Sequence, residues 1–244
     1  MLRRMSRSAR LFALAAALPL CLASATASAQ MGQGPPTPLA MDLSKVAVGS
    51  WAQYSMTMGV MPPMSMRMAL VAKGAAGNTL EMSVDGGMTA KLGKVVTQVT
   101  LPLAKDWDGR VQKLVLQVGS NDPMEMPVSG TQSKQFAKPD PKTLVKAETL
   151  KVAGGSFKTK HYRDKSPQGD TIDFWVADNV APIGLVRIEM DQKNNPMIKG
   201  TVKMELTSLG KDAKPTISKP AKPFDQGALV KQMMAGAGAA PPAK

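Results

Sequence analysis

The 244-residue chain has little of the residue types on which common enzyme sites depend, with one Cys, one His and ten aromatic residues. A single Cys excludes an internal disulfide framework, and one Cys with one His excludes a zinc site built from these two residue types. A Ser-His-Asp or Cys-His hydrolase would have to use His161 as its base. No motif in the chain indicates a reaction, so we predict a protein that is not an enzyme.

The chain also has few long hydrophobic runs, and the main one lies near the N-terminus. Residues 11–23 are apolar, follow four Arg residues and precede the small residues Ala27–Ala29. Such a run is too short to span about 30 Å of hydrocarbon as a helix, but it is typical of a signal peptide. We therefore predict that residues 1–29 are a signal peptide that exports the protein to the periplasm or the cell exterior. Acylation of Cys21 is the alternative, although Leu20 is larger than the residue that a lipoprotein peptidase prefers before it.

Positive charge is in excess, with 31 Lys and Arg against 18 Asp and Glu and a formal charge of +13. Removing residues 1–29 takes away four Arg and no acid, which leaves +9. Residues 211–244 hold six Lys and two Asp, which is +4 of this remainder. Aromatic residues are not interleaved with the lysines as a nucleic-acid stacking platform needs, so we predict no nucleic-acid partner. An anionic membrane surface remains a candidate partner.

Most of the chain from residue 41 to 210 alternates between apolar and polar side chains, which is typical of half-buried β-strands. The alternating segments are short, and turn signals such as Pro62-Pro63 separate them, because two prolines remove two backbone donors. The pattern recurs about ten times and leaves little room for helix. We predict an all-β fold with minor α content: a strongly curved antiparallel sheet or an incomplete β-barrel of about ten strands.

The flanking segments have a different composition. Residues 30–40 are rich in Gly and Pro and predict a flexible lead-in. Residues 211–244 are rich in Lys, Pro and Ala and predict a disordered tail with a short amphipathic helix. Within the β-rich domain, residues 119–138 are polar and irregular, which predicts a long loop or a lid. Asp140 precedes a proline, which signals a short helix of at most two turns.

Methionine is unusually abundant, with 19 residues in the chain. Alternation places six of them on one predicted sheet face together with other apolar side chains. Met is unbranched and polarizable, so it can repack around varied apolar guests as well as fill an ordinary core. We predict that the concave face binds an apolar ligand or a lipid acyl chain. The candidate binding residues are Tyr54, Met56, Met58, Met64, Met66, Met68, Leu70 and Met82.

Two other functions stay open. Closely spaced Met thioethers can bind Cu(I), which would make the chain a Met-rich copper-binding periplasmic protein. Against this, copper sites of this kind usually include a His, and His161 lies about a hundred residues away, where a hydrogen-bonded strand residue is the simpler interpretation. The other alternative is a structural envelope protein that acts through its basic tail. We predict no catalytic residue, metal ligand or cofactor.

Several segments resemble the exported bacterial lipoprotein carriers similar to LolA and LolB. The resemblance covers residues 47–209 and rests on the strand-turn-strand GGSFKTKHYR, the strand of Trp175, the turn VAPIGLV and the final strand MELTSLG. It implies a periplasmic half-barrel whose concave apolar face holds acyl chains and whose open mouth is plugged by helices. The present chain has little predicted helix for such a plug.

Overall fold

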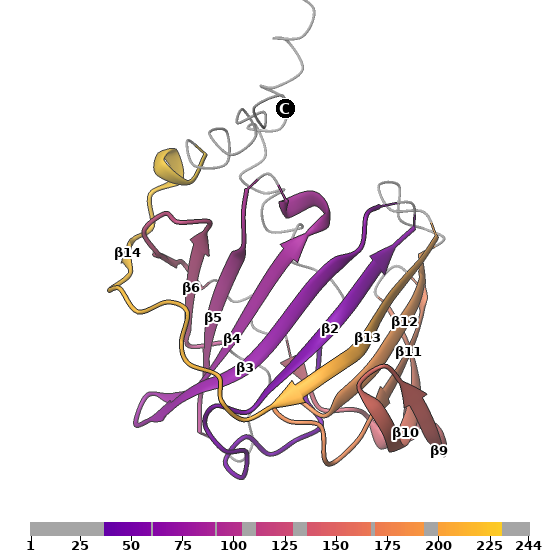
Figure 1. Ribbon diagram of the computed structural model, residues 1–244. Coiled ribbons are helices and arrows are strands. Elements are labelled where there is room, and N and C mark those ends of the chain that lie inside the picture. The colour runs from indigo at the N-terminus through magenta and orange to yellow at the C-terminus, as the bar shows by residue number, and fades with distance from the viewer. Residues whose placement is uncertain are drawn as a thin grey trace, which may run out of the picture. The chain divides into compact units, whose positions relative to one another are not determined.

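The described part of the chain is almost entirely β-structure (Figure 1). The computed structural model describes residues 37–59, 61–90, 92–103, 111–128, 136–166, 169–192 and 200–230. The predicted signal peptide, with Cys21, lies outside these residues. Within them, one twelve-stranded sheet is accompanied by a two-stranded sheet.

The large sheet has two arms, which meet where β2 pairs with β13. The N-terminal arm consists of β2 (Trp51–Met58), β3 (Met64–Gly74), β4 (Gly77–Gly86), β5 (Val95–Leu101), β6 (Lys113–Val118) and β7 (Met124–Met126). The C-terminal arm consists of β9 (Leu144–Val152), β10 (Gly155–Lys165), β11 (Thr171–Val176), β12 (Leu185–Gln192) and β13 (Gly200–Gly210). The strand order is β14-β7-β6-β5-β4-β3-β2-β13-β12-β11-β10-β9, where β14 is Lys222–Pro223.

This sheet is strongly curved and open (Figure 1), with β9 at one edge and β14 at the other. Ten of its twelve described strands have six or more residues. The prediction of a curved antiparallel sheet of about ten strands is therefore confirmed. The alternation predicted these strands correctly because side chains on a half-buried strand alternate between core and solvent.

Residues from the N-terminal segment and from the connection after β7 pack into the core that the two arms share. Strand β1 (Thr37–Pro38) pairs in parallel with β8 (Phe136–Ala137). Leu39, Leu43 and Val46 are buried in the same core cluster as Phe136 and the inner faces of both arms. The predicted lead-in thus contributes to the core from residue 37 onward, and the irregular segment 119–138 contains β7 and β8.

The prediction of a disordered tail is wrong for residues 211–223, which pack along the sheet and which we name the strap. In Figure 1 the strap is the yellow chain that runs from the end of β13 to β14 at the opposite edge. The backbone amide of Ala213 donates to the carbonyl of Gly49 (2.9 Å), and Ile217 is buried against Val96 and Val115. Gly49 has φ +89°, and a Cβ there would lie 2.7 Å from the carbonyl oxygen of Lys211, so only glycine fits this crossing.

One buried charge holds the strap to the sheet. The carboxylate of Glu81 on β4 accepts from the backbone amide of Thr216 (2.8 Å) and from the side chain of Gln98 (2.9 Å). At the far end, Lys219 and Lys222 lie 3.4 and 2.8 Å from the carboxylate of Asp122. Composition alone predicted disorder because it could not show these partners, which are distant in sequence.

Short helical turns occur where the sequence signals them. Asp140 caps a 3-10 turn at Pro141–Thr143, and its carboxylate accepts from the backbone amide of Lys142 (2.9 Å). Strand β9 follows at once, so the predicted helix is shorter than two turns. Another 3-10 turn, Gly87–Thr89, follows β4. Residues 226–230 form a helical turn that Asp225 caps through the backbone amide of Ala228 (3.0 Å).

Candidate functional site

The eight predicted ligand-binding residues do share one sheet face, as their alternation indicated. By register, Tyr54 lies opposite Met66, Met56 opposite Met64, and Met68 opposite Met82. Tyr54, Met64, Met66, Met68 and Leu70 are buried, whereas Met56, Met58 and Met82 are half-buried. Tyr54, Met66, Met68 and Leu70 belong to the main core cluster, so much of this face is packed interior.

The hydroxyl group of Tyr54 has a structural partner. It donates to the carbonyl oxygen of Leu185 on β12 (3.0 Å), across the groove between the arms. Full burial raises the pKa of Tyr54, because the phenolate would lose its hydration. The side chain therefore remains a neutral hydrogen-bond donor that joins the two arms.

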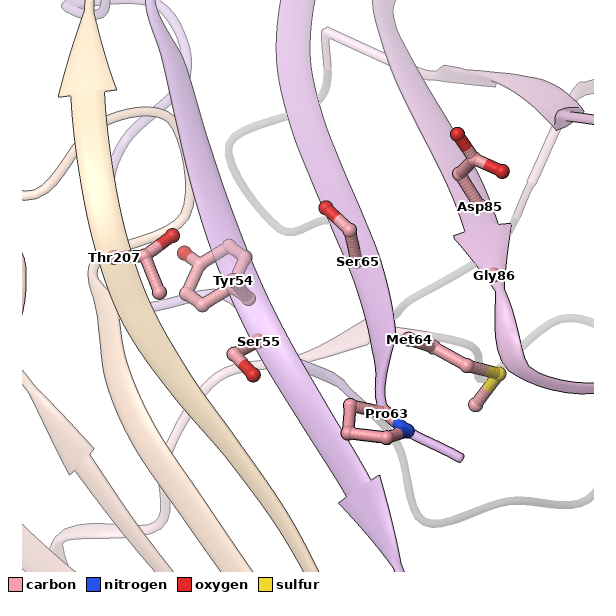
Figure 2. Close-up of a pocket in the computed structure, with 8 residues that line it drawn as sticks. All are labelled: Tyr54, Ser55, Pro63, Met64, Ser65, Asp85, Gly86 and Thr207. Carbon is pink, nitrogen blue, oxygen red and sulfur yellow. The ribbon is translucent and has the colours of Figure 1, made fainter. Parts of the chain in front are cut away.

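A shallow cavity of about 460 Å³ lies over the junction of β2, β3, β4 and β13. Figure 2 shows its lining, with Met64 directed toward Gly86 and the carboxylate of Asp85 across from Ser65. It takes only Tyr54 and Met64 from the predicted set, and Ser55, Ser65 and Asp85 form a polar row across the strands. The polar row and the shallow shape make this cavity a poor container for an acyl chain.

A larger cavity, about 600 Å³, lies between the two arms and is closed by the N-terminal segment; we name it the base cavity. One wall comes from the end of β5 and the residues that follow it, and the other comes from β10 and β11. Its apolar lining includes Leu39, Leu43, Leu101, Leu103 and Val176. None of the eight predicted ligand-binding residues lines the base cavity.

The base cavity also carries polar groups. Lys138, Lys160 and Tyr162 line it, with Asp42 and Asp178. The pKa of Asp42 lies below its usual range, chiefly because Ser44 donates to its carboxylate and also because Lys45 and Lys138 are near. Asn78, which is buried in this lining, has a side-chain oxygen without a hydrogen-bond partner among the described residues.

His161 lies in a different place, on the opposite face of the sheet. By register it is opposite Trp175, which is opposite Arg187, and the two rings of His161 and Trp175 stack with centroids 4.3 Å apart. Its Nε2 atom lies 2.6 Å from a carboxylate oxygen of Asp173, and its Nδ1 atom lies 3.8 Å from one of Glu148. The prediction of a hydrogen-bonded strand residue is confirmed.

The two carboxylates beside His161 remain ionised in this setting. Burial alone would raise the pKa of Asp173, but hydrogen bonds from Arg163 and His161 outweigh it and lower the pKa. The pKa of Glu148 is lowered because Trp175 and Lys146 donate to its carboxylate. The cluster thus joins β9, β10 and β11 by paired charges rather than presenting a reactive group in a cavity.

Within the described ranges, no three or more His, Cys, Asp or Glu side chains converge as metal ligands would. In the same part of the chain, no helix has both the length and the apolar character needed to cross a bilayer.

Comparisons with known proteins add similarity of fold only. The chain matches no protein-family model, and no curated protein matches it. Its structure is similar to a hypothetical protein from Chlamydia trachomatis, with 16% identity, a TM-score of 0.45, and coverage of 77% of this chain and 98% of that one. It is also similar to a "putative lipoprotein" from Parabacteroides distasonis, with 15% identity, a TM-score of 0.34, and coverage of 72% and 100%.

Proposed function

We propose that this protein is an exported, non-enzymatic carrier or binding protein that holds a lipid acyl chain or another apolar ligand in the base cavity. The observation that carries the proposal is the cavity itself. Its volume of about 600 Å³ falls in the range of ligand pockets, which is about 300 to 1,000 Å³.

The chemistry of the lining supports an amphiphilic occupant. Leucine side chains from two segments, residues 39–43 and 101–103, provide a surface for an acyl chain, and burying each methylene group there contributes about 0.8 kcal/mol. Lys138, Lys160 and Tyr162 provide donors for a polar end of the ligand. A cavity with an apolar surface and a few convergent polar groups is typical of small-molecule binding.

A cavity-filling substitution tests the proposal. Leu103 lines the base cavity and is 56% exposed, so Leu103→Trp can narrow the cavity without disturbing the core. We expect wild-type protein to bind a fluorescent fatty acid and Leu103→Trp to bind it about 10-fold more weakly, which is the effect of losing about 1.4 kcal/mol. The measurement is fluorescence titration, with native mass spectrometry of the exported protein to detect copurifying lipid.

Leu209→Trp is the matched control. Leu209 is also an exposed leucine, 42% accessible, but it lies on β13 and does not line the base cavity. We expect the control to bind the fatty acid as the wild type does. Equal affinity of all three proteins would move the ligand elsewhere, and absence of binding by the wild type would refute the proposal.

A further inference from the structure

One face of the β9–β10 hairpin is exposed to solvent beside the base cavity. Alternation in the two strands is regular: Val145, Ala147, Thr149 and Lys151 on β9 are exposed, as are Ser156, Lys158 and Lys160 on β10. By register, Lys158 lies opposite Thr149 and Lys160 opposite Ala147, so these side chains share one face. The other face of the hairpin is buried through Phe157, Thr159 and His161.

The charge on this face is mainly positive. We name Lys151, Lys158 and Lys160 the lysine face; Asp164, next to the last residue of β10, is an acidic residue at an exposed position of the same alternation. Among the described residues, none of the three forms an ion pair. Glu148 on β9 is on the other face, where Trp175 donates to its carboxylate (2.8 Å).

The lysine face is continuous with the proposed ligand site. Lys160 belongs to it and also lines the base cavity, next to Tyr162 on the same strand. At the start of β9, Leu144 and Val145 are 47% and 48% exposed, which is unusual for two adjacent apolar residues at an edge. The hairpin therefore combines three lysines that form no ion pair with another described residue, two exposed apolar side chains and the rim of the base cavity.

We propose that the lysine face docks the protein on an anionic membrane surface, with the rim of the base cavity toward the lipid headgroups. This goes beyond ligand binding, because it states where the ligand is taken up or released. Charge complementarity selects an anionic partner, since each Lys near such a surface contributes about 1 kcal/mol. Exposed Leu144 and Val145 favour a membrane over a soluble polyanion, because only the membrane offers them an apolar environment.

Vesicle binding by charge-matched variants tests the docking surface. The test variant carries Lys151→Gln, Lys158→Gln and Lys160→Gln. The control carries Lys94→Gln, Lys211→Gln and Lys214→Gln, which are exposed lysines on other parts of the molecule. Co-sedimentation is measured with phosphatidylcholine vesicles that contain phosphatidylglycerol, and with phosphatidylcholine alone. All proteins are used in the form in which they are purified after export.

We expect the wild type to bind only the phosphatidylglycerol vesicles, and to lose binding as salt rises. The test variant should bind on the order of 100-fold more weakly, whereas the control should change by only a few fold. Equal weakening of both variants would overturn the proposal, because it would show a general effect of net charge. Equal binding of the wild type to both vesicle types would overturn it as well.

Two further measurements separate this proposal from others. Leu103→Trp should lose fatty-acid affinity but still bind vesicles only when they contain phosphatidylglycerol, so loss of ligand binding and loss of docking can be told apart. Sedimentation velocity of the protein without lipid should show the same species for the wild type and the test variant. A wild-type dimer that the test variant lacks would assign the lysine face to a second copy of the chain and refute membrane docking.

Discussion

The two arms of the sheet have the same alternating sequence pattern but are covered on different faces. In the N-terminal arm the strap crosses the outer face, where Ile217 packs on Val96 and Val115. In the β9–β10 hairpin of the C-terminal arm, the outer face is the buried one, through Phe157 and His161. The opposite face of the hairpin, which carries Lys158 and Lys160, is exposed to solvent. The strap therefore covers part of the outer face of the N-terminal arm, whereas the exposed face of the hairpin lies beside the base cavity.

Alternation therefore determines which residues share a face, but not which face is covered. Covering depends on segments that are distant in sequence. Glu81 and Thr216, which hold the strap, are 135 residues apart. Gly154 and Leu206, which join the hairpin to β13, are 52 residues apart.

Truncating the residue at which the hairpin meets β13 should have the largest effect. Leu206 is fully buried, and its carbonyl oxygen accepts from the backbone amide of Gly154 (3.1 Å). Leu206→Ala should lower the free energy of unfolding by about 3 kcal/mol, since it removes buried methyl groups and leaves a cavity. Urea denaturation measures this. The neighbour Leu209 is exposed, so Leu209→Ala should cost about 0.5 kcal/mol or less; a similar loss for both would contradict a tight joint.

Removing the charge that holds the strap should have the next largest effect. In Glu81→Ala the backbone amide of Thr216 and the side chain of Gln98 lose their acceptor. Hydrogen bonds to a charged group contribute about 1.5 to 3 kcal/mol, so we expect a loss of about 2 kcal/mol. Hydrogen exchange of residues 211–223 should accelerate. Glu125→Ala, which breaks an exposed ion pair with Lys113, is the control and should leave that exchange unchanged.

A conservative substitution in the Met face should have a smaller effect. Met66 is buried in the core between Tyr54 and Val84. If this part of the face is ordinary core, Met66→Leu should cost less than about 1.5 kcal/mol, as volume-conserving swaps do. Fatty-acid affinity should not change, because Met66 does not line the base cavity. Weaker fatty-acid binding by this variant would return the ligand to the Met face.

Lowering the pH should weaken the contacts of the strap with the sheet, and we expect this effect on stability to be the smallest of the four. The pKa of Asp212 is lowered chiefly because Trp51 donates to its carboxylate, and that of Asp122 because Lys222 and Lys219 do. A carboxyl group whose pKa is lower in the folded state stabilises it above the unfolded pKa, near 3.8, and this contribution is lost as pH falls through the folded pKa.

The measurement is the NMR signal of the Trp51 indole N–H as a function of pH. In the wild type it should shift below about pH 4, the usual range of Asp. In Asp212→Asn the shift should be absent, because that variant has no carboxyl group to titrate. A shift of the same size in both proteins would assign the titration to another group.

Much of the fold could be predicted from the sequence, because strands and turns depend on local patterns. Alternation around Tyr54 and Met66 gave the correct shared face, and Asp140 gave the correct turn. The sheet edges, the strap and the packing of the N-terminal segment into the core could not be predicted in this way. The segments that contain Leu39, Phe136 and Ile217 have no regular apolar pattern. Each of these side chains is nevertheless buried.

The candidate site was predicted less well than the fold. Lys138, Lys160 and Asn78 become neighbours only after the two arms curve toward each other. The local sequence FKTKH did indicate one feature: Lys158 and Lys160 alternate with Phe157, so they lie on the exposed face of the strand when Phe157 is buried. The high number of Met residues does not distinguish a packed interior from a binding surface.

The unequal edges of the sheet limit how copies of the chain could associate through their backbones. Strand β14 is two residues long and ends in Pro223, which has no N–H to offer a new strand, whereas β9 is a nine-residue edge. Two copies could join β9 to β9, but a third would find no second long edge in the twelve-stranded sheet of the described residues. Association by strand addition would thus end at a closed pair and could not grow into a fibre.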